Sequence, residues 1–474
     1  MKNVLLIHPS RKILGEKDNL YTNESLVPSL GLSSITAYAR QQGINAAIID
    51  LRLSHHGIED TLEWIKKNNP VLVGITAFTT EITAANIIAG MIKEVFPQLP
   101  VIVGGPHPSQ IPGETLSEFK NIDIVVIGEG EKTIVELVQI FESNKTEEIS
   151  NVQGIAFRNN GEIIINQARQ PIEDIDSLPF PAWDLFELKY YNKIFPISTS
   201  RGCPYRCYFC SPNYLGKKIR IKQYNNIVNE ISWLVDKYGA EHIQFADATM
   251  GLLKDEAILL CEEIIKRELN KKISWDCEIR ADSVNMTLLG KMKEAGCGFV
   301  AFGVESGNEF FLKEIIKKGE TKDQIKNAVN MSQKAGLKVR CFFILGHYTE
   351  TVETIKETIK FALELNPDAL SFGLMVPNPG TEFRKLAEEG AGGLKILHNT
   401  WENYQQFNYD CLESESLSLQ ILKKWQSNAY FTFYLHHPFK ALGLFFSQSA
   451  YNYSFKGIIK IPIMLLKNKF KKNA

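Results

Sequence analysis

Three cysteines lie within eight residues of the chain, at Cys203, Cys207 and Cys210, with three and then two residues between them. Three thiolates at this spacing can bind three irons of a 4Fe–4S cluster and leave the fourth iron open for a small chelating cosubstrate. A zinc site would need a fourth nearby ligand, whereas the closest histidines, His242 and His107, lie far along the chain. A disulfide is disfavoured in a chain of cytosolic character. The spacing therefore favours a cluster.

The elements that must position these cysteines form a repeating pattern over residues 195–376. A strand predicted at Pro196–Thr199 ends just before the cysteines, which places them on a strand-end loop. Five more predicted strands alternate with helical segments, at His242–Phe245, Ile273–Ile279, Phe299–Val304, Val339–Leu345 and Ala369–Met375. Six strand–helix units predict a six-stranded partial TIM barrel, whose chemistry belongs at the carboxyl ends of the strands.

Polar residues follow each of the later strands of this predicted barrel. They are Asp247, Arg280, Asp282, Glu305, Ser306, His347, Glu350 and Asn378. Any single one could equally be a helix cap or an ion-pair partner. Because ligands of such barrels bind at the carboxyl ends of the strands, all of them are candidates for ligand contacts.

Residues 1–145 alternate short Val- and Ile-rich runs with helical segments, which predicts a doubly wound parallel sheet. Ligands of such sheets bind at the carboxyl ends of the strands, where glycines allow a close approach. The residues at these ends are Thr76 and Phe78, then Gly104, Gly105, His107 and Ser109, then Gly128, Glu129 and Gly130. A domain of this class could bind a flavin or nothing. A GxGxxG fingerprint is absent after the first strand, which argues against a nicotinamide cofactor.

Residues 146–194 and 386–474 lack the strand–helix alternation of the two predicted domains. Asn159-Asn160-Gly161 is a hairpin signal, and a proline-punctuated stretch that reads as a linker follows it. The expected division is a sheet domain at 1–145, a hairpin and linker at 146–194, a barrel at 195–385, and a mainly helical C-terminal region with a basic tail at 386–474.

Charge is distributed unevenly along the 474 residues. The net charge is −1, yet the final 59 residues carry nine lysines and no arginine, aspartate or glutamate. Such an end suggests contact with an anionic membrane surface, and the alternative is a helical cap over the barrel with a frayed basic end. No signal peptide is evident, and no apolar run reaches the roughly 18 residues of a spanning helix. We therefore expect a cytoplasmic protein that associates peripherally with a membrane, and no specific nucleic-acid partner.

The cysteine loop from Arg201 to Ser211 resembles the signature of the radical S-adenosylmethionine (SAM) superfamily. The resemblance implies that Cys203, Cys207 and Cys210 carry the cluster, that SAM chelates its fourth iron, and that Phe209 packs near the adenine. An electron from a flavodoxin or ferredoxin-like donor would then cleave SAM to methionine and a 5′-deoxyadenosyl radical.

Other segments of the barrel are similar to this family too. By that resemblance Asp247 lies near the SAM amino group, Arg280 near its carboxylate or ribose, and Glu305 or Ser306 contacts SAM. Pro377-Asn-Pro-Gly-Thr381 resembles a turn that the family has after its sixth strand. One departure follows the fifth strand, where the family commonly has G-x-P-G-E-T and this chain has Gly346-His-Tyr-Thr-Glu-Thr351. We expect a different turn there, with His347 or Tyr348 facing the substrate.

The glycine-rich ends of the first domain look like those of the cobalamin-binding domain that precedes the core in one large radical SAM subfamily. The resemblance implies that the corrin and its nucleotide tail are lined by Thr76, Phe78, Gly104, Gly105, His107, Ser109, Gly128, Glu129 and Gly130. The D-x-H-x-x-G pattern, whose histidine binds cobalt from below, is missing after Asp50, because His55 and His56 are out of register. We expect no histidine of that pattern beneath the cobalt.

Taken together, the resemblance implies a cobalamin-dependent radical SAM enzyme that methylates an unactivated carbon. Methylcobalamin would hold the methyl group, and a second SAM would restore it. The alternative within the family is a cyclase or oxidative enzyme that transfers no methyl group. A tRNA methylthiotransferase would need three more cluster cysteines before residue 150, where there are none. A non-enzymatic cobalamin module would not need the three cysteines. The expected substrate is a small or lipid-linked molecule.

Overall fold

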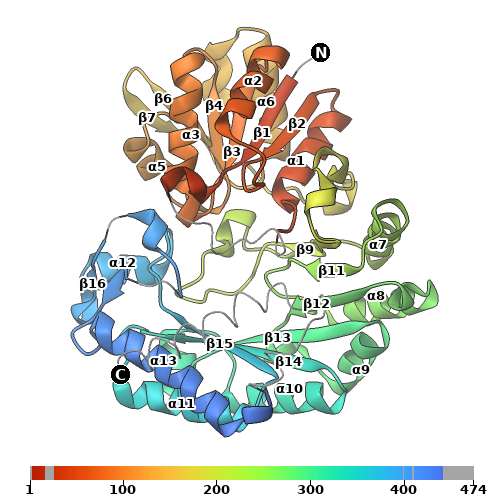
Figure 1. Cartoon of the computed structure of the whole chain (residues 1–474), viewed down its shortest axis with the longest axis vertical. Helices are drawn as coiled ribbons and strands as arrows, with labels where there is room; N and C mark the ends of the chain where they lie inside the picture. Colours follow the sequence, from red (N-terminus) through yellow and green to blue (C-terminus); the bar gives the residue numbers. More distant parts are fainter. Residues whose placement is uncertain (1–2, 16–25, 399, 408–409, 441–474) are drawn as a thin grey trace. The chain divides into compact units, whose positions relative to one another are not determined.

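The computed structural model describes residues 3–15, 26–398, 400–407 and 410–440, which fold into two compact units (Figure 1). The first unit comprises Met1–Pro196, Ser200–Pro204 and Ser211–Lys222. The second comprises Ile197–Thr199, Tyr205–Cys210 and the chain from Gln223 onward. Cys203 therefore belongs to the first unit, whereas Cys207 and Cys210 belong to the second.

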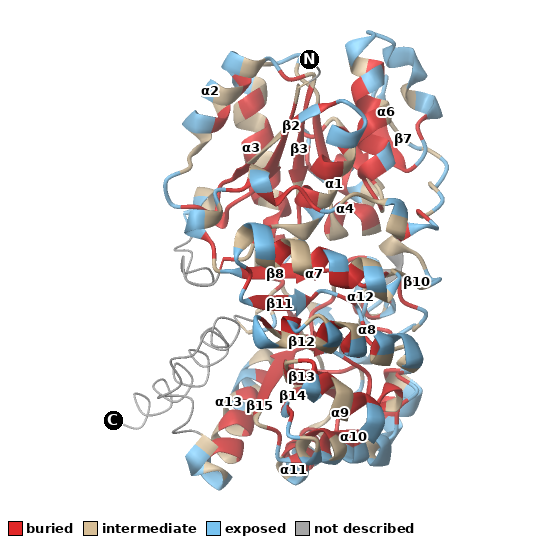
Figure 2. Ribbon diagram, turned by 90° about the vertical axis from the view of Figure 1, so that its right-hand side faces the viewer, coloured by how far each residue is buried: buried red, intermediate tan, exposed pale blue. Residues whose placement is uncertain are grey.

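The first unit is built on a seven-stranded sheet whose first five strands are parallel. The order is β2-β1-β3-β4-β5-β6-β7. The strands are β1 (Asn3–His8), β2 (Asn45–Asp50), β3 (Leu72–Thr76), β4 (Val101–Gly104), β5 (Ile124–Val126), β6 (Ile155–Asn159) and β7 (Glu162–Ile165). The apolar runs of β1 to β6 are largely buried, whereas those of β7 are not (Figure 2). Because the chain order reverses between β1 and β3, the carboxyl ends of these strands form the switch point where such sheets bind ligands.

Helices connect the parallel strands of this sheet and cover it. They are α1 (Leu30–Gln41), α2 (Ile58–Asn68), α3 (Ile82–Val95), α4 (Pro106–Gln110), α5 (Pro112–Glu118) and α6 (Glu131–Glu142). Helix α1 packs with α6, and α2 packs with α3. Buried residues of α3 recur three or four positions apart, as Ile82, Ala85, Ile88, Ala89 and Ile92 do, which is the pattern of a helix with one apolar face. The predicted doubly wound sheet is confirmed.

The predicted hairpin forms, and it extends the sheet of the first unit. Strands β6 and β7 pair antiparallel, and β6 also pairs antiparallel with β5. Asn160 and Gly161 have φ of 49° and 88° at the turn, and two consecutive positive values are typical of tight hairpin turns. The sequence pattern had assigned this hairpin to a linker segment, whereas pairing with β5 makes it the antiparallel edge of the sheet.

The second unit is built on a six-stranded sheet of order β15-β14-β13-β12-β11-β8, of which β8 belongs to this unit only at its last residue, Ile197. Its strands are β8 (Ile194–Ile197), β11 (His242–Phe245), β12 (Ser274–Glu278), β13 (Cys297–Glu305), β14 (Lys338–Leu345) and β15 (Ala369–Leu374). The connecting helices are α7 (Tyr224–Tyr238), α8 (Lys254–Lys266), α9 (Met286–Glu294), α10 (Lys322–Lys334) and α11 (Val352–Leu365). The spatial order follows the chain order, as in a partial barrel of strand–helix units. The predicted six-stranded core is confirmed.

The C-terminal region covers the last strand of this core. It begins with α12 (Glu382–Glu388), and α13 (Leu419–His436) packs on α11 and β15. At Phe372 of β15, the backbone N–H donates to the Tyr430 hydroxyl at 2.9 Å, and the carbonyl accepts from the Gln426 amide at 2.8 Å. Side chains of α13 thus satisfy backbone groups of a strand at the edge of the sheet.

None of the helices in the described part of the chain is long and apolar enough to cross a membrane. The predicted basic membrane-contact segment, Lys456–Lys472, lies outside the described residues.

We expect Gln426→Met to destabilise the fold by about 1–3 kcal/mol, because it leaves the buried Phe372 carbonyl without its donor. Denaturant unfolding of the full chain measures the change. Gln420→Met is the matched control, since Gln420 lies on the same helix and is exposed. The interpretation fails if the two variants unfold at the same denaturant concentration.

Candidate functional site

The first cysteine of the loop is held by backbone contacts within the first unit. Strand β9 (Ser200–Arg201) pairs antiparallel with β10 (Arg220–Ile221), and the Cys203 N–H donates to the Gly216 carbonyl at 3.2 Å. Gly202, between strand and cysteine, has φ of 88°, and an added Cβ there would collide with the Lys218 carbonyl. Only glycine fits this approach, so the position of Cys203 depends on its neighbour.

Cys207 and Cys210 flank a residue that sequence reasoning missed, Tyr208. The Tyr208 hydroxyl lies 2.9 Å from Nδ1 of His347 and accepts the Tyr348 N–H at 3.2 Å. Its backbone N–H donates to the Ile316 carbonyl at 3.4 Å, and its carbonyl accepts the Phe383 N–H at 3.0 Å. Tyr208 therefore fixes the stretch between the two cysteines to three later segments of the second unit. No motif or periodic pattern in the sequence predicts that the Tyr208 side chain is buried or what it contacts.

His347 is oriented toward Tyr208. Its ring is 1% exposed and stacks on the Tyr208 ring, and burial lowers the pKa of His347 to about 4. The unprotonated Nδ1 of a neutral imidazole can accept a hydrogen bond from the tyrosine hydroxyl. In the described structure His347 is thus a support of the cysteine loop, and the Phe209 ring packs edge-on against it.

The turn after β14 is organised by Glu350. Its Oε2 accepts the N–H groups of Gly346 at 2.5 Å and His347 at 3.1 Å. Thr349, at the position where the family pattern has glycine, has φ of 61°, a left-handed conformation that is costly for a β-branched residue. Burial raises the pKa of Glu350 to about 8, so the carboxyl keeps its proton at neutral pH.

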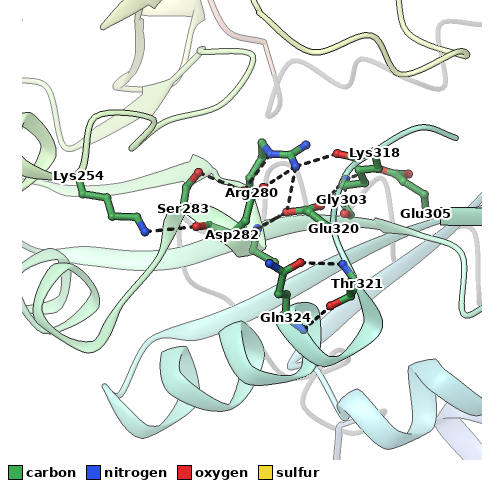
Figure 3. Close-up of polar contacts among 11 residues, drawn as sticks. Lys254, Arg280, Asp282, Ser283, Gly303, Glu305, Lys318, Glu320, Thr321 and Gln324 are labelled. Carbon is green, nitrogen blue, oxygen red and sulfur yellow. Dashed lines mark hydrogen bonds and ion pairs between the residues drawn. The ribbon is translucent and has the colours of Figure 1, made fainter. Parts of the chain in front are cut away.

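A buried polar network joins the carboxyl ends of β12 and β13 (Figure 3). Arg280 donates from Nε and Nη2 to the two carboxylate oxygens of Asp282, at 3.0 and 2.7 Å. Nη2 also donates to the Lys318 carbonyl at 2.8 Å. The guanidinium lies 3.7 Å from the centre of the Tyr205 ring, a cation–π contact. Arg280 thereby connects the start of the cysteine loop to the segment around Lys318.

Lys318 supplies the central cation of this network, and sequence reasoning missed it. Its Nζ lies 3.1 Å from Oε1 of Glu305 and 3.4 Å from Oε2 of Glu320, and it donates to the Gly303 carbonyl. Burial alone would lower the pKa of Lys318, but the carboxylates of Glu305 and Glu320 outweigh that effect and raise it. Glu305 has φ of 66°, so the network also holds a strained backbone in place.

Two other predicted SAM contacts have protein partners as well. Oδ2 of Asp247 accepts the Thr199 N–H at 3.1 Å, which joins the ends of β11 and β8. Ser306 is fully buried, and its hydroxyl accepts the Asn308 N–H at 3.2 Å and lies 3.4 Å from the Thr358 hydroxyl. Asp247, Arg280, Glu305 and Ser306 follow three neighbouring strands, as expected from the sequence.

In the first unit the predicted corrin-lining residues follow three adjacent strands. Thr76 of β3 and Gly104 of β4 are register partners, and β5 lies next to β4. Gly105 has φ of 111°, and a Cβ there would lie 2.8 Å from the Ala77 carbonyl oxygen, so this tip requires glycine. The Ser109 hydroxyl accepts the Gly128 N–H at 3.0 Å, which ties two tips together.

The side chains at these tips differ in exposure. His107 is buried, whereas Phe78 is 54% exposed. Gly130 directly precedes α6, and a Cβ there would lie 3.0 Å from the side chain of Ile35. A glycine-rich edge with one exposed aromatic side chain fits the close approach of a large flat ligand such as a corrin.

The carboxylate of Glu129 is enclosed by two guanidinium groups. Oε1 lies 2.9 Å from Nη1 of Arg201 and 2.9 Å from Nη1 of Arg220, and Oε2 accepts the Ile172 N–H at 2.7 Å. Arg201 also pairs with Glu131 at 2.7 Å. Arg201 lies next to the cysteines in the sequence, but no motif there predicts a partner for it or for Arg220.

The carboxyl ends of β1 and β2 carry a further buried cluster. Asp50 accepts from Nη2 of Arg52 and from the Tyr191 hydroxyl, each at 2.6 Å. Burial alone would raise the pKa of Asp50, but Arg52 outweighs it and lowers that pKa. His55 and His56, farther along this loop, contact Glu187 at 3.2 and 2.6 Å.

Comparison with known proteins accounts for both units. The radical SAM superfamily profile matches residues 197–362, and the B12 binding domain profile matches residues 17–138. An uncharacterized methyltransferase of Pyrococcus horikoshii is 34% identical over 413 residues, which cover 86% of this chain and 88% of that protein. The chain belongs to the radical SAM superfamily.

This radical SAM enzyme is also similar in sequence to a cyclase and in structure to a methyltransferase. The anaerobic magnesium-protoporphyrin IX monomethyl ester cyclase of Cereibacter sphaeroides is 28% identical, over 83% of this chain and 66% of that protein. The structure of the radical SAM methyltransferase TsrM from Kitasatospora setae aligns with a TM-score of 0.73 at 18% identity, covering 92% of this chain and 89% of that one. The second similarity concerns the fold.

The cofactors of this radical SAM enzyme are a 4Fe–4S cluster, SAM and cobalamin. The residues fit these groups. Cys203, Cys207 and Cys210 are three thiolate donors on one loop, which is a donor set for a cluster with an open iron. The glycines after β4 and β5 leave backbone exposed to a ligand at the edge where open α/β sheets bind theirs.

We expect Glu350→Gln to remove a pH dependence of stability. The folded carboxyl keeps its proton up to about pH 8, whereas 4.5 is its ordinary value, so its contribution is present below pH 4.5 and is lost as the pH rises through 8. Each pKa unit corresponds to about 1.4 kcal/mol. The variant should match the parent in urea unfolding at pH 4.5 and exceed it at pH 8.5.

The matched control is Glu353→Gln, an exposed residue in the first turn of α11, which should track the parent at both values. A Glu350→Gln protein that is no more stable than the parent at pH 8.5 would contradict the assignment of a protonated Glu350.

Proposed function

We propose that this enzyme transfers a methyl group from SAM to an unactivated carbon of a small molecule. The observation that carries the proposal is the 34% identity with a methyltransferase over nearly the full length of both chains. An alignment that covers 86% of this chain must include part of the B12 binding domain as well as the radical SAM domain. A carbon without a lone pair cannot attack a methyl donor directly. Its methylation therefore needs a radical, which the cluster and SAM generate, and a methyl carrier, which is the cobalamin.

The proposed cofactor contacts follow from position. Cys203, Cys207 and Cys210 hold the cluster, and Phe209, Asp247, Arg280, Glu305 and Ser306 border SAM. The corrin and its tail are bordered by Thr76, Phe78, Gly104, Gly105, His107, Ser109, Gly128, Glu129 and Gly130. Support comes from their places at the carboxyl ends of neighbouring strands.

When bound, the three cofactors supply a hydrogen-abstracting radical and a methyl group. The chain's own residues provide position and shelter. Tyr208 and His347 hold the stretch between Cys207 and Cys210, and Arg280 covers the Tyr205 ring, which lies just before Cys207. The buried ends of β12 and β13 keep water away from the strand ends, which a reactive radical requires.

A second candidate is a cyclisation or oxidation without methyl transfer. The 28% identity with a magnesium-protoporphyrin monomethyl ester cyclase favours it. The two reactions differ in the use of SAM, because only methyl transfer converts SAM to S-adenosylhomocysteine.

We predict that methyl-deuterated SAM labels the product of an anaerobic incubation with cell extract and reductant. Two SAM molecules should be consumed for each product, one giving 5′-deoxyadenosine and one giving S-adenosylhomocysteine. Mass spectrometry measures the label and both nucleosides. Cys207→Ala should abolish 5′-deoxyadenosine, since two thiolates cannot hold a cluster with one open iron. A product that gains no deuterium while 5′-deoxyadenosine accumulates would favour the cyclase instead.

We also propose that a flavodoxin or ferredoxin-like protein supplies the electron, that the protein acts in the cytoplasm, and that the basic end contacts an anionic membrane carrying a lipid-linked substrate. Support for the last point comes from the sequence. Six lysines and many apolar residues share the segment 456–472, and each basic residue near an anionic leaflet contributes about 1 kcal/mol.

Flotation with anionic and neutral vesicles tests this contact. We expect the full chain to float with anionic vesicles at low salt, and the change of Lys467, Lys469, Lys471 and Lys472 to Gln to weaken binding by at least tenfold. The same change at four exposed lysines elsewhere, Lys66, Lys67, Lys132 and Lys217, is the matched control. Equal flotation of both variants would exclude a role for the tail.

A further inference from the structure

The corrin-side tips of the first unit make direct contacts with both flanks of the cysteine loop. Residues 200–204 precede or include the first cysteine, residues 211–222 follow the last, and both belong to the first unit. They are called here the two flanks. The contacts come from α4 and from the tip at Gly128–Glu131, which are the same segments that the proposed function assigns to the corrin.

The stronger contact is the charge cluster around Glu129. Its carboxylate pairs with Arg201 of the first flank and with Arg220 of the second, each at 2.9 Å. Arg201 bridges to Glu131 at 2.7 Å. The side chains of Glu129, Glu131 and Arg220 are 5%, 4% and 3% exposed, and that of Arg201 is 16% exposed. Charge-assisted hydrogen bonds at such burial are strong and directional.

Uncharged contacts reinforce this cluster. The Gln110 amide at the end of α4 donates to the Ser211 carbonyl at 2.6 Å, one residue after Cys210. At Gly128, an added Cβ would lie 3.0 Å from the Tyr214 carbonyl oxygen. The Gly128 backbone therefore packs against the second flank, and Ser109 holds that glycine through its N–H.

The position of Cys203, the first proposed cluster ligand, depends on these contacts. Arg201 and Cys203 are separated by Gly202, whose left-handed backbone leaves no room for a side chain. Cys203 is also bonded to Gly216 of the second flank. A displacement of the Gly128–Glu131 tip would therefore move Arg201, and with it the backbone that carries the Cys203 thiolate.

We propose that Glu129 is a positioning residue that couples the two cofactor sites, so that cobalamin binding and cluster binding strengthen each other. The inference rests on the assignment of the tips to the corrin and does not depend on methyl transfer. By thermodynamic reciprocity, the factor by which the cluster tightens cobalamin equals the factor by which cobalamin tightens the cluster. Coupling of this kind commonly amounts to about 5- to 150-fold.

The test measures hydroxocobalamin affinity of the full chain, anaerobically, with and without reconstituted cluster. We expect the cluster-loaded protein to bind at least fivefold more tightly, and hydroxocobalamin to raise the chelator concentration that removes half of the iron. Glu129→Gln should reduce the affinity ratio below twofold, since the amide cannot pair with two guanidinium groups.

Glu136→Gln is the matched control, because Glu136 lies on α6, the helix that directly follows the Glu129 tip, and pairs with Arg169 instead. It should retain the full ratio. Should Glu129→Gln fail to fold, as judged by circular dichroism, Arg201→Lys decides, because its single ammonium cannot bridge Glu129 and Glu131 as the guanidinium does.

Three results would overturn the proposal. The first is a parent ratio below fivefold, including the absence of hydroxocobalamin binding. The second is a ratio of twofold or more in Glu129→Gln, or an unchanged ratio in Arg201→Lys. The third is an equal loss of coupling in Glu136→Gln. Failure of methyl transfer is a separate result, since an enzyme that binds both cofactors and transfers no methyl group would still show the coupling.

Discussion

The enclosure of the Glu129 carboxylate by Arg201 and Arg220 is the interaction on which the ligand edge of the first unit depends. Charges this deeply buried are stabilising only when paired in good geometry, because removal of one partner leaves the other without water or counterion. The same carboxylate accepts the Ile172 N–H. The Glu129 side chain thus joins three segments: the tip after β5, the linker at Ile172, and the segment before the first cysteine.

The second unit uses a comparable device at its strand ends. Lys318 lies between Glu305 and Glu320, while Arg280 is held by Asp282 and covers Tyr205. The backbone of Glu305 is left-handed, a conformation that persists only where neighbouring contacts compensate for it. These contacts within the protein give the strand ends a defined shape. Preorganisation of this kind lets an enzyme bind cofactors without spending their binding energy on ordering side chains.

The turn between β14 and α11 shows how a departure from a family pattern is accommodated. Without proline and glycine, Gly346–Thr351 is closed by Glu350, which accepts two backbone N–H groups, and Thr349 takes the left-handed conformation. The turn directs His347 to the Tyr208 hydroxyl. In this loop, His347 therefore supports the cysteine loop through Tyr208, whereas the sequence pattern predicted that His347 or Tyr348 faces the substrate.

The sequence by itself determined the chemistry of the cysteines and the class of both sheets. Thiolate spacing, glycine-rich strand ends and apolar periodicity are patterns of residues close together in the chain, so they can be recognised without knowledge of the fold. The sequence also located the hairpin turn at Asn160-Gly161, because two residues suffice to set it. It could not tell that β6 would pair with β5, since pairing depends on which edge is open.

Only the tertiary structure decided which polar side chains meet. Tyr208 and His347 are 139 positions apart, Arg201 and Glu129 are 72 apart, and Lys318 and Glu305 are 13 apart. No periodicity encodes such pairs, because a hydrogen bond or an ion pair needs its two atoms within a few ångströms and that distance follows from strand order, register and burial. Glu129 therefore read as one more residue of a glycine-rich tip, although burial and two arginines make it the anchor of the cysteine segment.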